Sequence, residues 1–79
     1  MSESGVQVLD VRGLLCPLPV IRTQDRIKAL PDGARLDVVA TDPGAMHDIP
    51  AFCRVHGHEL ISADQRDREF WIRVRVRHS

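Results

Sequence analysis

Along this chain of 79 residues, short apolar runs typical of β-strands alternate with segments whose apolar residues are spaced as on one face of an α-helix. Residues 6–11 ("VQVLDV") and 35–41 ("RLDVVAT") are short runs rich in β-branched residues, which favour strands. Residues 58–64 and 69–76 form two more runs of this kind, and the polar segment "QRDR" between them predicts a hairpin. The pattern therefore predicts four strands, of which the last two are consecutive.

The spacing of apolar residues predicts a first helix over residues 17–30, before the turn sequence "PDG". The apolar positions at near-helical spacing are Val20, Ile21, Ile27 and Leu30. We expect a second helix with Asp42 as its N-cap, Pro43 in its first turn and Gly57 at its end. Pro50 falls inside this segment, and we interpret it as a kink in one helix rather than a break between two.

The last strand has two faces of opposite character, because side chains alternate across a strand. One face is apolar and carries Phe70, Ile72, Val74 and Val76. The other carries Trp71, Arg73, Arg75 and Arg77. Long helical connections imply parallel strand pairs, so the order β-α-β-α-β-β predicts an α/β two-layer sandwich. In this fold two helices cover one face of a four-stranded mixed sheet, and the arginine-bearing face is open.

The length, composition and charge of the chain limit the number of domains and the classes of function that it can have. The chain is long enough for a single domain, predicted at residues 6–79, after a flexible N-terminus at residues 1–5. No apolar run is long enough for a membrane span and no secretory signal pattern begins the chain, so we expect a cytoplasmic protein without membrane contact. Eleven basic and eleven acidic residues give no net charge, which makes direct nucleic-acid binding through overall charge an unlikely function.

The stretch "GLLCPLPV" at residues 13–20 contains the main candidate for chemistry. Cys16 falls where the first strand's loop meets the first helix, and both prolines fall in the helix's first turn, where they stiffen the loop. The amides and positive dipole end of a helix start favour an anion, so we expect a lowered pKa and a nucleophilic thiolate at Cys16. The alternative is that Cys16 is a small buried core residue.

The second cysteine, the histidines and three aspartates have simpler interpretations than a role in catalysis or metal binding. Cys53 could resolve an oxidised Cys16, but its position in the middle of a helix favours a core role, and no Cys-x-x-Cys motif is present. No metal or other cofactor is predicted, since the histidines lack cysteines at zinc-ligand spacing; they are His47, His56 and His58. Three aspartates are assigned to strand-end or capping roles: Asp10, Asp42 and Asp48.

Several segments together resemble the TusA (SirA-like) family of sulfur-carrier proteins. They are "LD" at 9–10, "GLLCPLPV" at 13–20, "ATDP" at 40–43, "DIPAFC" at 48–53 and "HEL" at 58–60. The resemblance runs from Leu9 to Val76, and its Cys-Pro-x-Pro box and its "DIP-x-FC" box are specific. The family's fold has the order β-α-β-α-β-β, in agreement with the pattern above.

The resemblance implies a sulfurtransferase-type function at Cys16. Cys16 would accept a sulfane sulfur as a persulfide from a cysteine desulfurase or a rhodanese-like donor, and pass it to a cysteine of an acceptor protein. Gly13, Pro17, Leu18 and Pro19 complete the box around this thiol. Family members serve tRNA thiolation, molybdenum-cofactor assembly or sulfur oxidation. Members that thiolate tRNA often carry an acidic residue between the two prolines, and this chain departs from them at Leu18.

A second hypothesis is a non-catalytic protein- or RNA-binding module that uses the open sheet face. Its motivation is the stripe of Trp71, Arg73, Arg75 and Arg77, which could dock an acidic partner or single-stranded RNA. Arg12 and Arg22 are close to Cys16 in sequence and could add positive potential around a persulfide or a docked partner.

Overall fold

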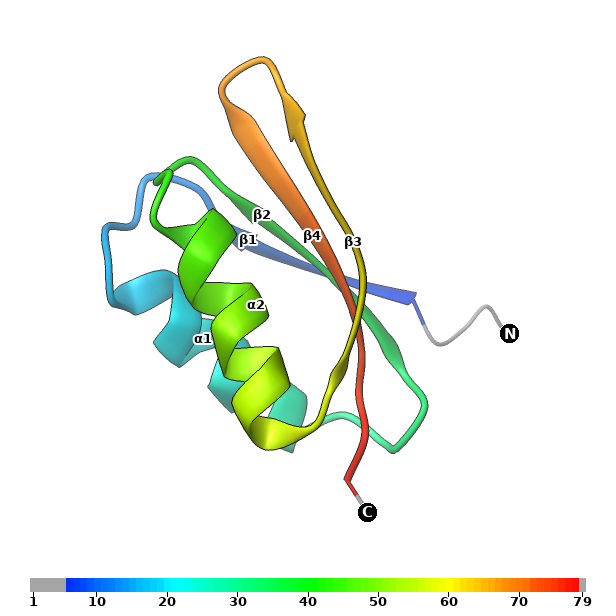
Figure 1. Ribbon diagram of the computed structural model, residues 1–79. Coiled ribbons are helices and arrows are strands. Elements are labelled where there is room, and N and C mark those ends of the chain that lie inside the picture. The colour runs from blue at the N-terminus through cyan, green and yellow to red at the C-terminus, as the bar shows by residue number, and fades with distance from the viewer. Residues whose placement is uncertain (1–5, 79) are drawn as a thin grey trace.

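The chain folds in the predicted order of elements, and the computed structural model describes residues 6–78. The elements are β1 (Val6–Val11), α1 (Leu18–Lys28), β2 (Arg35–Ala40), α2 (Ala45–His56), β3 (Glu59–Arg66) and β4 (Glu69–Arg75). Both helices lie on the same side of the sheet, and the β3–β4 hairpin extends past them (Figure 1). The predicted two-layer α/β sandwich is therefore confirmed, while the predicted flexible segment 1–5 lies outside the described residues.

The sheet is mixed, with the strand order β1-β2-β4-β3. β1 and β2 are parallel, with Val11 opposite Ala40, and α1 is the crossover between them. β4 pairs antiparallel with both β2 and β3, and the β3–β4 turn contains Asp67 at a φ of 56°. The parallel pair matters for function, because it places the segments that follow β1 and β2 at the same edge of the sheet.

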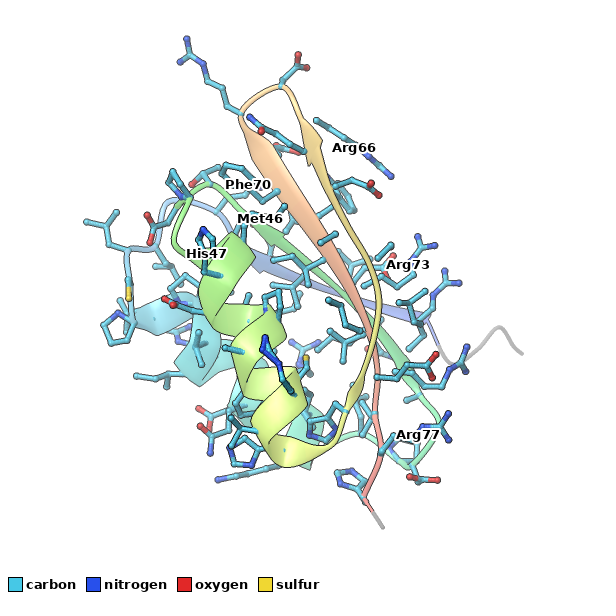
Figure 2. All side chains as sticks on the ribbon, viewed as in Figure 1. Met46, His47, Arg66, Phe70, Arg73 and Arg77 are labelled. Atoms are coloured by element: carbon cyan, nitrogen blue, oxygen red, sulfur yellow. The ribbon has the colours of Figure 1, made fainter. Side chains whose placement is uncertain are left out.

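The core lies between the helices and one face of the sheet, as the alternation along the last strand predicts. Ile72, Val74 and Val76 are fully buried and Phe70 is half-buried on the helix side. Figure 2 shows Phe70 and Met46 on the helix side of the sheet and Arg73 on the other side. The other buried apolar residues come mainly from β2 and the helices: Val11, Ile27, Ala34, Leu36, Val38, Ala40, Ala45, Ile49 and Cys53.

The predicted core face of α1 is partly wrong. Its buried residues are Pro19, Thr23 and Ile27, whereas Ile21 is 43% exposed. Thr23 is accommodated because its hydroxyl donates a hydrogen bond of 2.7 Å to the carbonyl oxygen of Pro19 within the helix. The hydrophobic spacing failed here because two core positions hold a proline and a satisfied hydroxyl instead of aliphatic side chains.

The start of α2 also differs from prediction, although its end does not. Gly44 is the N-cap, so Asp42 does not cap the helix and Pro43, predicted in its first turn, also precedes it. α2 runs as one helix with Pro50 inside it, which agrees with one helical segment rather than two. Gly57 ends the helix in the left-handed conformation with a φ of 80°, as expected for a C-terminal glycine.

His58 joins the start of β3 to the chain segment that follows β4. Its Nδ1 accepts a hydrogen bond of 3.0 Å from the backbone N–H of Arg77. Its ring also stacks on Phe52 and lies edge-on to His78, with centroid distances of 5.8 and 6.2 Å. Burial, together with the neighbouring His78 and His56, lowers the pKa of His58 below its usual range.

We expect this imidazole to make the stability of the protein pH-dependent. Because the pKa of His58 is lowered by folding, the folded state binds a proton less readily than the unfolded state. The free energy of unfolding should therefore decrease as pH falls below about 6.5, because a protonated Nδ1 can no longer accept a hydrogen bond. Urea unfolding between pH 8 and pH 5 measures this change. His58→Asn, which keeps an acceptor but does not titrate, should flatten the pH dependence, and an unchanged slope would contradict the assignment.

Candidate functional site

The segment with Cys16 leaves the sheet edge at which the parallel strands β1 and β2 both end. The segment after β2 holds it in place through two hydrogen bonds. Gly13, at a φ of 80°, donates its N–H to the Thr41 hydroxyl at 2.8 Å. The N–H of Cys16 donates to Oδ2 of Asp42 at 3.0 Å. The backbone around the thiol is therefore fixed by side chains 26 to 28 residues away in sequence.

The proline box forms the start of α1. Pro17 is the N-cap residue and follows Cys16 through a cis peptide bond, and Leu18 is the first helical residue. Pro19 is buried against the core, while Leu18 is exposed. The thiol thus lies just before the helix, close in sequence to the buried Pro19 and the exposed Leu18.

The thiol of Cys16 is exposed and has one side-chain partner. Cys16 is classed among the exposed residues, which rules out the alternative of a buried core cysteine. Its Sγ lies 3.2 Å from Oδ2 of Asp48, a distance at which the S–H group donates a hydrogen bond to the carboxylate. Asp48 lies in the first turn of α2, so the second helix also reaches the thiol.

The electrostatic environment of Cys16 is opposite to the one predicted. The hydrogen bond to Asp48, partial desolvation and the negative charges of Asp48 and Asp42 raise the pKa of the thiol above its usual range. The predicted helix effect is weak, because Pro17 and Pro19 have no N–H and the N–H of Leu18 donates to the carbonyl of Leu15 at 2.8 Å. In the free protein Cys16 is therefore a thiol at neutral pH and not a thiolate.

Asp42 and Asp48 are the functional residues that sequence reasoning missed. Both had been assigned to local capping, which is what an aspartate near a helix start usually does. Gly44 lies between them, and a Cβ at this position would stand 3.3 Å from Oδ2 of Asp42 and 3.7 Å from Oδ2 of Asp48. The glycine thus leaves room for both carboxylates beside Cys16. The only sequence signal for this arrangement was that both aspartates fall in the boxes shared with the resembled family.

The second cysteine has the structural role that its helical position predicts. Cys53 is 1% exposed in the core under α2, and burial raises the pKa of its thiol to about 11. Both cysteines of the chain are free. Cys53 is therefore a packed, unreactive thiol, and the exposed Cys16 is the only accessible sulfhydryl group.

A shallow apolar groove of about 370 Å³ opens beside the thiol, between α1 and α2. It is lined by Pro17, Val20, Asp48, Ala51, Phe52, Val55 and His56. Asp48 belongs to this groove and also accepts the hydrogen bond from Cys16, so the groove and the thiol are continuous. Exposed apolar side chains surround this region, among them Leu15 at 70% and Val55 at 78% exposure.

The arginine stripe lies on the open sheet face, but the structure pairs it with acids. Arg73 forms two hydrogen bonds with Asp37, from Nε at 3.0 Å and from Nη2 at 3.2 Å. Glu59 lies 3.5 Å from Nε of Arg75 and 3.1 Å from Nη2 of Arg77. Figure 2 shows Arg66 and Arg73 on this face. The stripe is therefore a set of ion pairs and not the free cationic surface that RNA binding needs.

Trp71 and Arg12 are likewise tied to local partners. The indole N–H of Trp71 donates to Glu69 at 3.3 Å, and the Arg66 guanidinium lies 4.8 Å from the centre of the Trp71 ring. Arg12 pairs with Asp10 at 2.8 Å and with Glu69 at 3.0 Å. Its guanidinium is therefore bound to acidic side chains of the sheet and is not paired at Cys16. Arg22 is exposed on α1.

Residues 6–78 offer neither a cluster of metal-ligating side chains nor a membrane-spanning helix. Within this range no group of three or more His, Cys, Asp or Glu side chains could hold a metal ion. His47 and His56 are exposed on α2, and His56 stacks on Phe52 with ring centroids 4.5 Å apart. None of the helices in this part of the chain is both long and apolar enough to cross a membrane.

Comparison with known proteins identifies the family. The family model described as "Sulfurtransferase TusA" matches residues 7–77, which is nearly the whole described chain. The chain belongs to the TusA family. The sulfur carrier protein TusA of Pseudomonas syringae pv. tomato is 44% identical over 68 residues, covering 84% of this chain and 81% of that protein. TusA of Pseudomonas aeruginosa (strain LESB58) is 40% identical over 78 residues, covering 96% of this chain and 99% of that protein.

The TusA fold is also found in a solved structure of low sequence identity. The SirA-like protein of Desulfitobacterium hafniense superposes with a TM-score of 0.80 at 17% identity, covering 92% of this chain and 99% of that chain. At this identity the likeness supports the fold alone. The sequence comparisons thus place the chain in the TusA family of sulfur carriers, and the structural comparison agrees with its fold.

Proposed function

We propose that this protein carries sulfane sulfur as a persulfide on Cys16, from a donor protein to the cysteine of an acceptor protein. The observation that carries the proposal is the difference between its two cysteines. Cys16 is exposed on a loop fixed by Thr41 and Asp42, whereas Cys53 is enclosed in the core. A relay between two proteins needs a thiol that both partners can reach, and Cys16 meets this need.

The transfer is a thiol–persulfide exchange that needs no external oxidant or reductant. The Cys16 thiolate attacks the outer sulfur of the donor's persulfide, a new S–S bond forms at Sγ, and the donor's S–S bond breaks. The donor cysteine leaves as a thiolate and takes up the proton that Cys16 has lost. In the second step the acceptor's thiolate attacks the outer sulfur on Cys16, which leaves as a thiolate and is protonated again.

The partners follow from this chemistry. The donor is a protein that forms a persulfide on its own cysteine, either a cysteine desulfurase or a rhodanese-like protein, and the acceptor presents a free cysteine. A reducing compartment such as the cytoplasm suits a carrier whose thiol must stay free between transfers. Because Leu18 is exposed beside Cys16, it lies where an acceptor would contact the loop and contributes an apolar contact there.

Loading of the native protein tests the proposal. After incubation with a cysteine desulfurase and L-cysteine, intact-mass spectrometry should show a gain of one sulfur atom. Dithiothreitol should remove it, and peptide mapping after alkylation should place it on Cys16. The absence of any adduct, or an adduct located on Cys53, would contradict the proposal.

A further inference from the structure

The contact between Cys16 and Asp48 runs against the needs of a sulfur relay. Sulfur exchange proceeds through a thiolate, yet Sγ stands 3.2 Å from a carboxylate oxygen, and Asp42 adds a second carboxylate at the backbone of the same residue. A thiolate in this position would face two negative charges. None of the salt bridges among residues 6–78 involves Asp42 or Asp48, and Arg12 is engaged with Asp10 and Glu69.

We propose that Asp48 restrains Cys16 as a thiol in the free protein and selects partners that bring a positively charged side chain to this carboxylate. The inference rests on the function proposed above and adds a specificity-determining residue to it. A lysine or arginine next to the partner's own reactive cysteine would pair with Asp48, remove its hydrogen bond from the thiol and favour the thiolate. Away from such a partner, Cys16 stays protonated and is protected from oxidants.

The position of Asp48 makes this selection possible. Asp48 lines the apolar groove between α1 and α2 as well as touching Sγ, so a partner that approaches Cys16 over the groove meets Asp48 at the same time. Leu15 and Val55 are exposed apolar side chains of this region, and Asp48 is the acidic side chain that lines the groove. The fitting partner surface is therefore apolar with one cation beside its cysteine.

Asp48 also destabilises a negative charge on Cys16 when the carrier holds sulfur. A persulfide anion on Cys16 would be repelled by Asp48 and Asp42, so the charged, loaded form is held less firmly than it would be at a neutral site. When the acceptor's thiolate takes the outer sulfur, Cys16 leaves as a thiolate, gains a proton from water and restores the S–H hydrogen bond to Asp48. The restraint therefore stabilises the resting thiol after the transfer, whereas during the transfer the leaving Cys16 thiolate depends on the partner's cation beside Asp48.

Asp48→Asn tests the restraint on the free protein. We expect alkylation of Cys16 by iodoacetamide at pH 7 to become about two- to fourfold faster, since the gain in thiolate exceeds the loss of intrinsic nucleophilicity. The midpoint of the pH–rate profile should also move to lower pH. Asp67→Asn removes the same charge in the β3–β4 turn, away from the β1–α1 loop (Figure 1), and should change neither quantity. An unchanged rate and midpoint in Asp48→Asn would overturn the proposal.

Small disulfides of different charge test the selection on the native protein. Cystamine is a cation, bis(2-hydroxyethyl) disulfide is neutral and 3,3′-dithiodipropionate is an anion. In each reaction the Cys16 thiolate attacks one sulfur, a mixed disulfide forms and the other half leaves as a thiolate. With each rate divided by that of N-acetylcysteine amide, cystamine should react about fivefold faster than the neutral disulfide and the anion more slowly. Added salt should reduce these differences, and so should Asp48→Asn.

If the normalised rates of the three disulfides with the native protein do not depend on their charge, the proposed selection by Asp48 is overturned. This failure is distinguishable from a failure of the proposed function, because persulfide loading is read by mass at Cys16 and not by the charge preference of a small disulfide. A protein that accepts sulfur without charge preference keeps the carrier function and loses the role of Asp48. A protein that shows the preference but accepts no sulfur keeps the restraint and loses the carrier function.

Discussion

Replacing Cys16 with alanine is expected to abolish sulfur loading completely and to leave the fold intact. The loss is complete because no other exposed thiol exists: the second cysteine is 1% exposed and burial raises its pKa to about 11. The fold survives because the exposed Cys16 side chain makes a single hydrogen bond, to Asp48, so the change in stability should stay within about 0.5 kcal/mol. Desulfurase loading followed by intact-mass spectrometry measures the first effect, and urea unfolding the second.

Cys53→Ala is the matched control and should behave in the opposite way. It removes one buried atom from the core under α2, which should cost about 1 kcal/mol of stability, and it leaves the accessible thiol in place. Loading at pH 7 should therefore be unchanged. Sulfur accepted by Cys16→Ala, or lost from folded Cys53→Ala, would show that the two cysteines have been assigned the wrong roles.

The sheet could be predicted from the sequence because its signals are local. In the last strand the alternation of apolar and charged residues places Ile72 and Val74 in the core and Arg73 on the open face, as the structure has them. The Gly57 stop of α2 follows from a property of that residue alone. A pattern read along the chain suffices when the cause lies within a few neighbouring residues.

The core face of α1 could not be predicted in the same way. Thr23 is buried because its hydroxyl finds an acceptor in the carbonyl of Pro19, and Ile21 is left at the surface. A hydrophobic count treats threonine and proline as surface residues. The helix was therefore found, and Val20, Ile27 and Leu30 pack on the core as their spacing suggests, but the buried Pro19 and Thr23 were not predicted.

The electrostatics of the candidate site depend on contacts that no local pattern encodes. Cys16 was identified from the Cys-Pro-x-Pro box, but the shift of its pKa was predicted in the wrong direction. That prediction considered only the helix that follows Cys16. Asp48 lies 32 residues further along and reaches the thiol because β1 and β2 end at the same sheet edge. The sequence could identify the accessible thiol proposed to carry sulfur, whereas the resting protonation state of that thiol depends on the tertiary fold.

The largest loss of stability from a single substitution is expected for Ile49→Ala. Ile49 is fully buried and is among the largest buried side chains of α2, the helix that carries Asp48 to the thiol. Truncation leaves a cavity between α2 and the sheet, and such changes cost about 3 to 4 kcal/mol. At about 0.05 to 0.15 kcal/mol per residue, a chain of this length has about 4 to 12 kcal/mol in total, so the variant should lose about a quarter or more of its stability.

Two controls on the same residue and the same helix make this prediction sharp. Ile49→Val removes one methyl group and should cost about 1 kcal/mol, while Val55→Ala, at a position 78% exposed, should stay within about 0.5 kcal/mol. Urea unfolding should show midpoints that fall in the order Val55→Ala, Ile49→Val, Ile49→Ala, with a constant dependence on urea concentration. Because Asp48 immediately precedes Ile49, the folded fraction of Ile49→Ala should also alkylate faster at Cys16. A loss no greater than that of Val55→Ala would mean that α2 is held to the sheet by contacts other than this one.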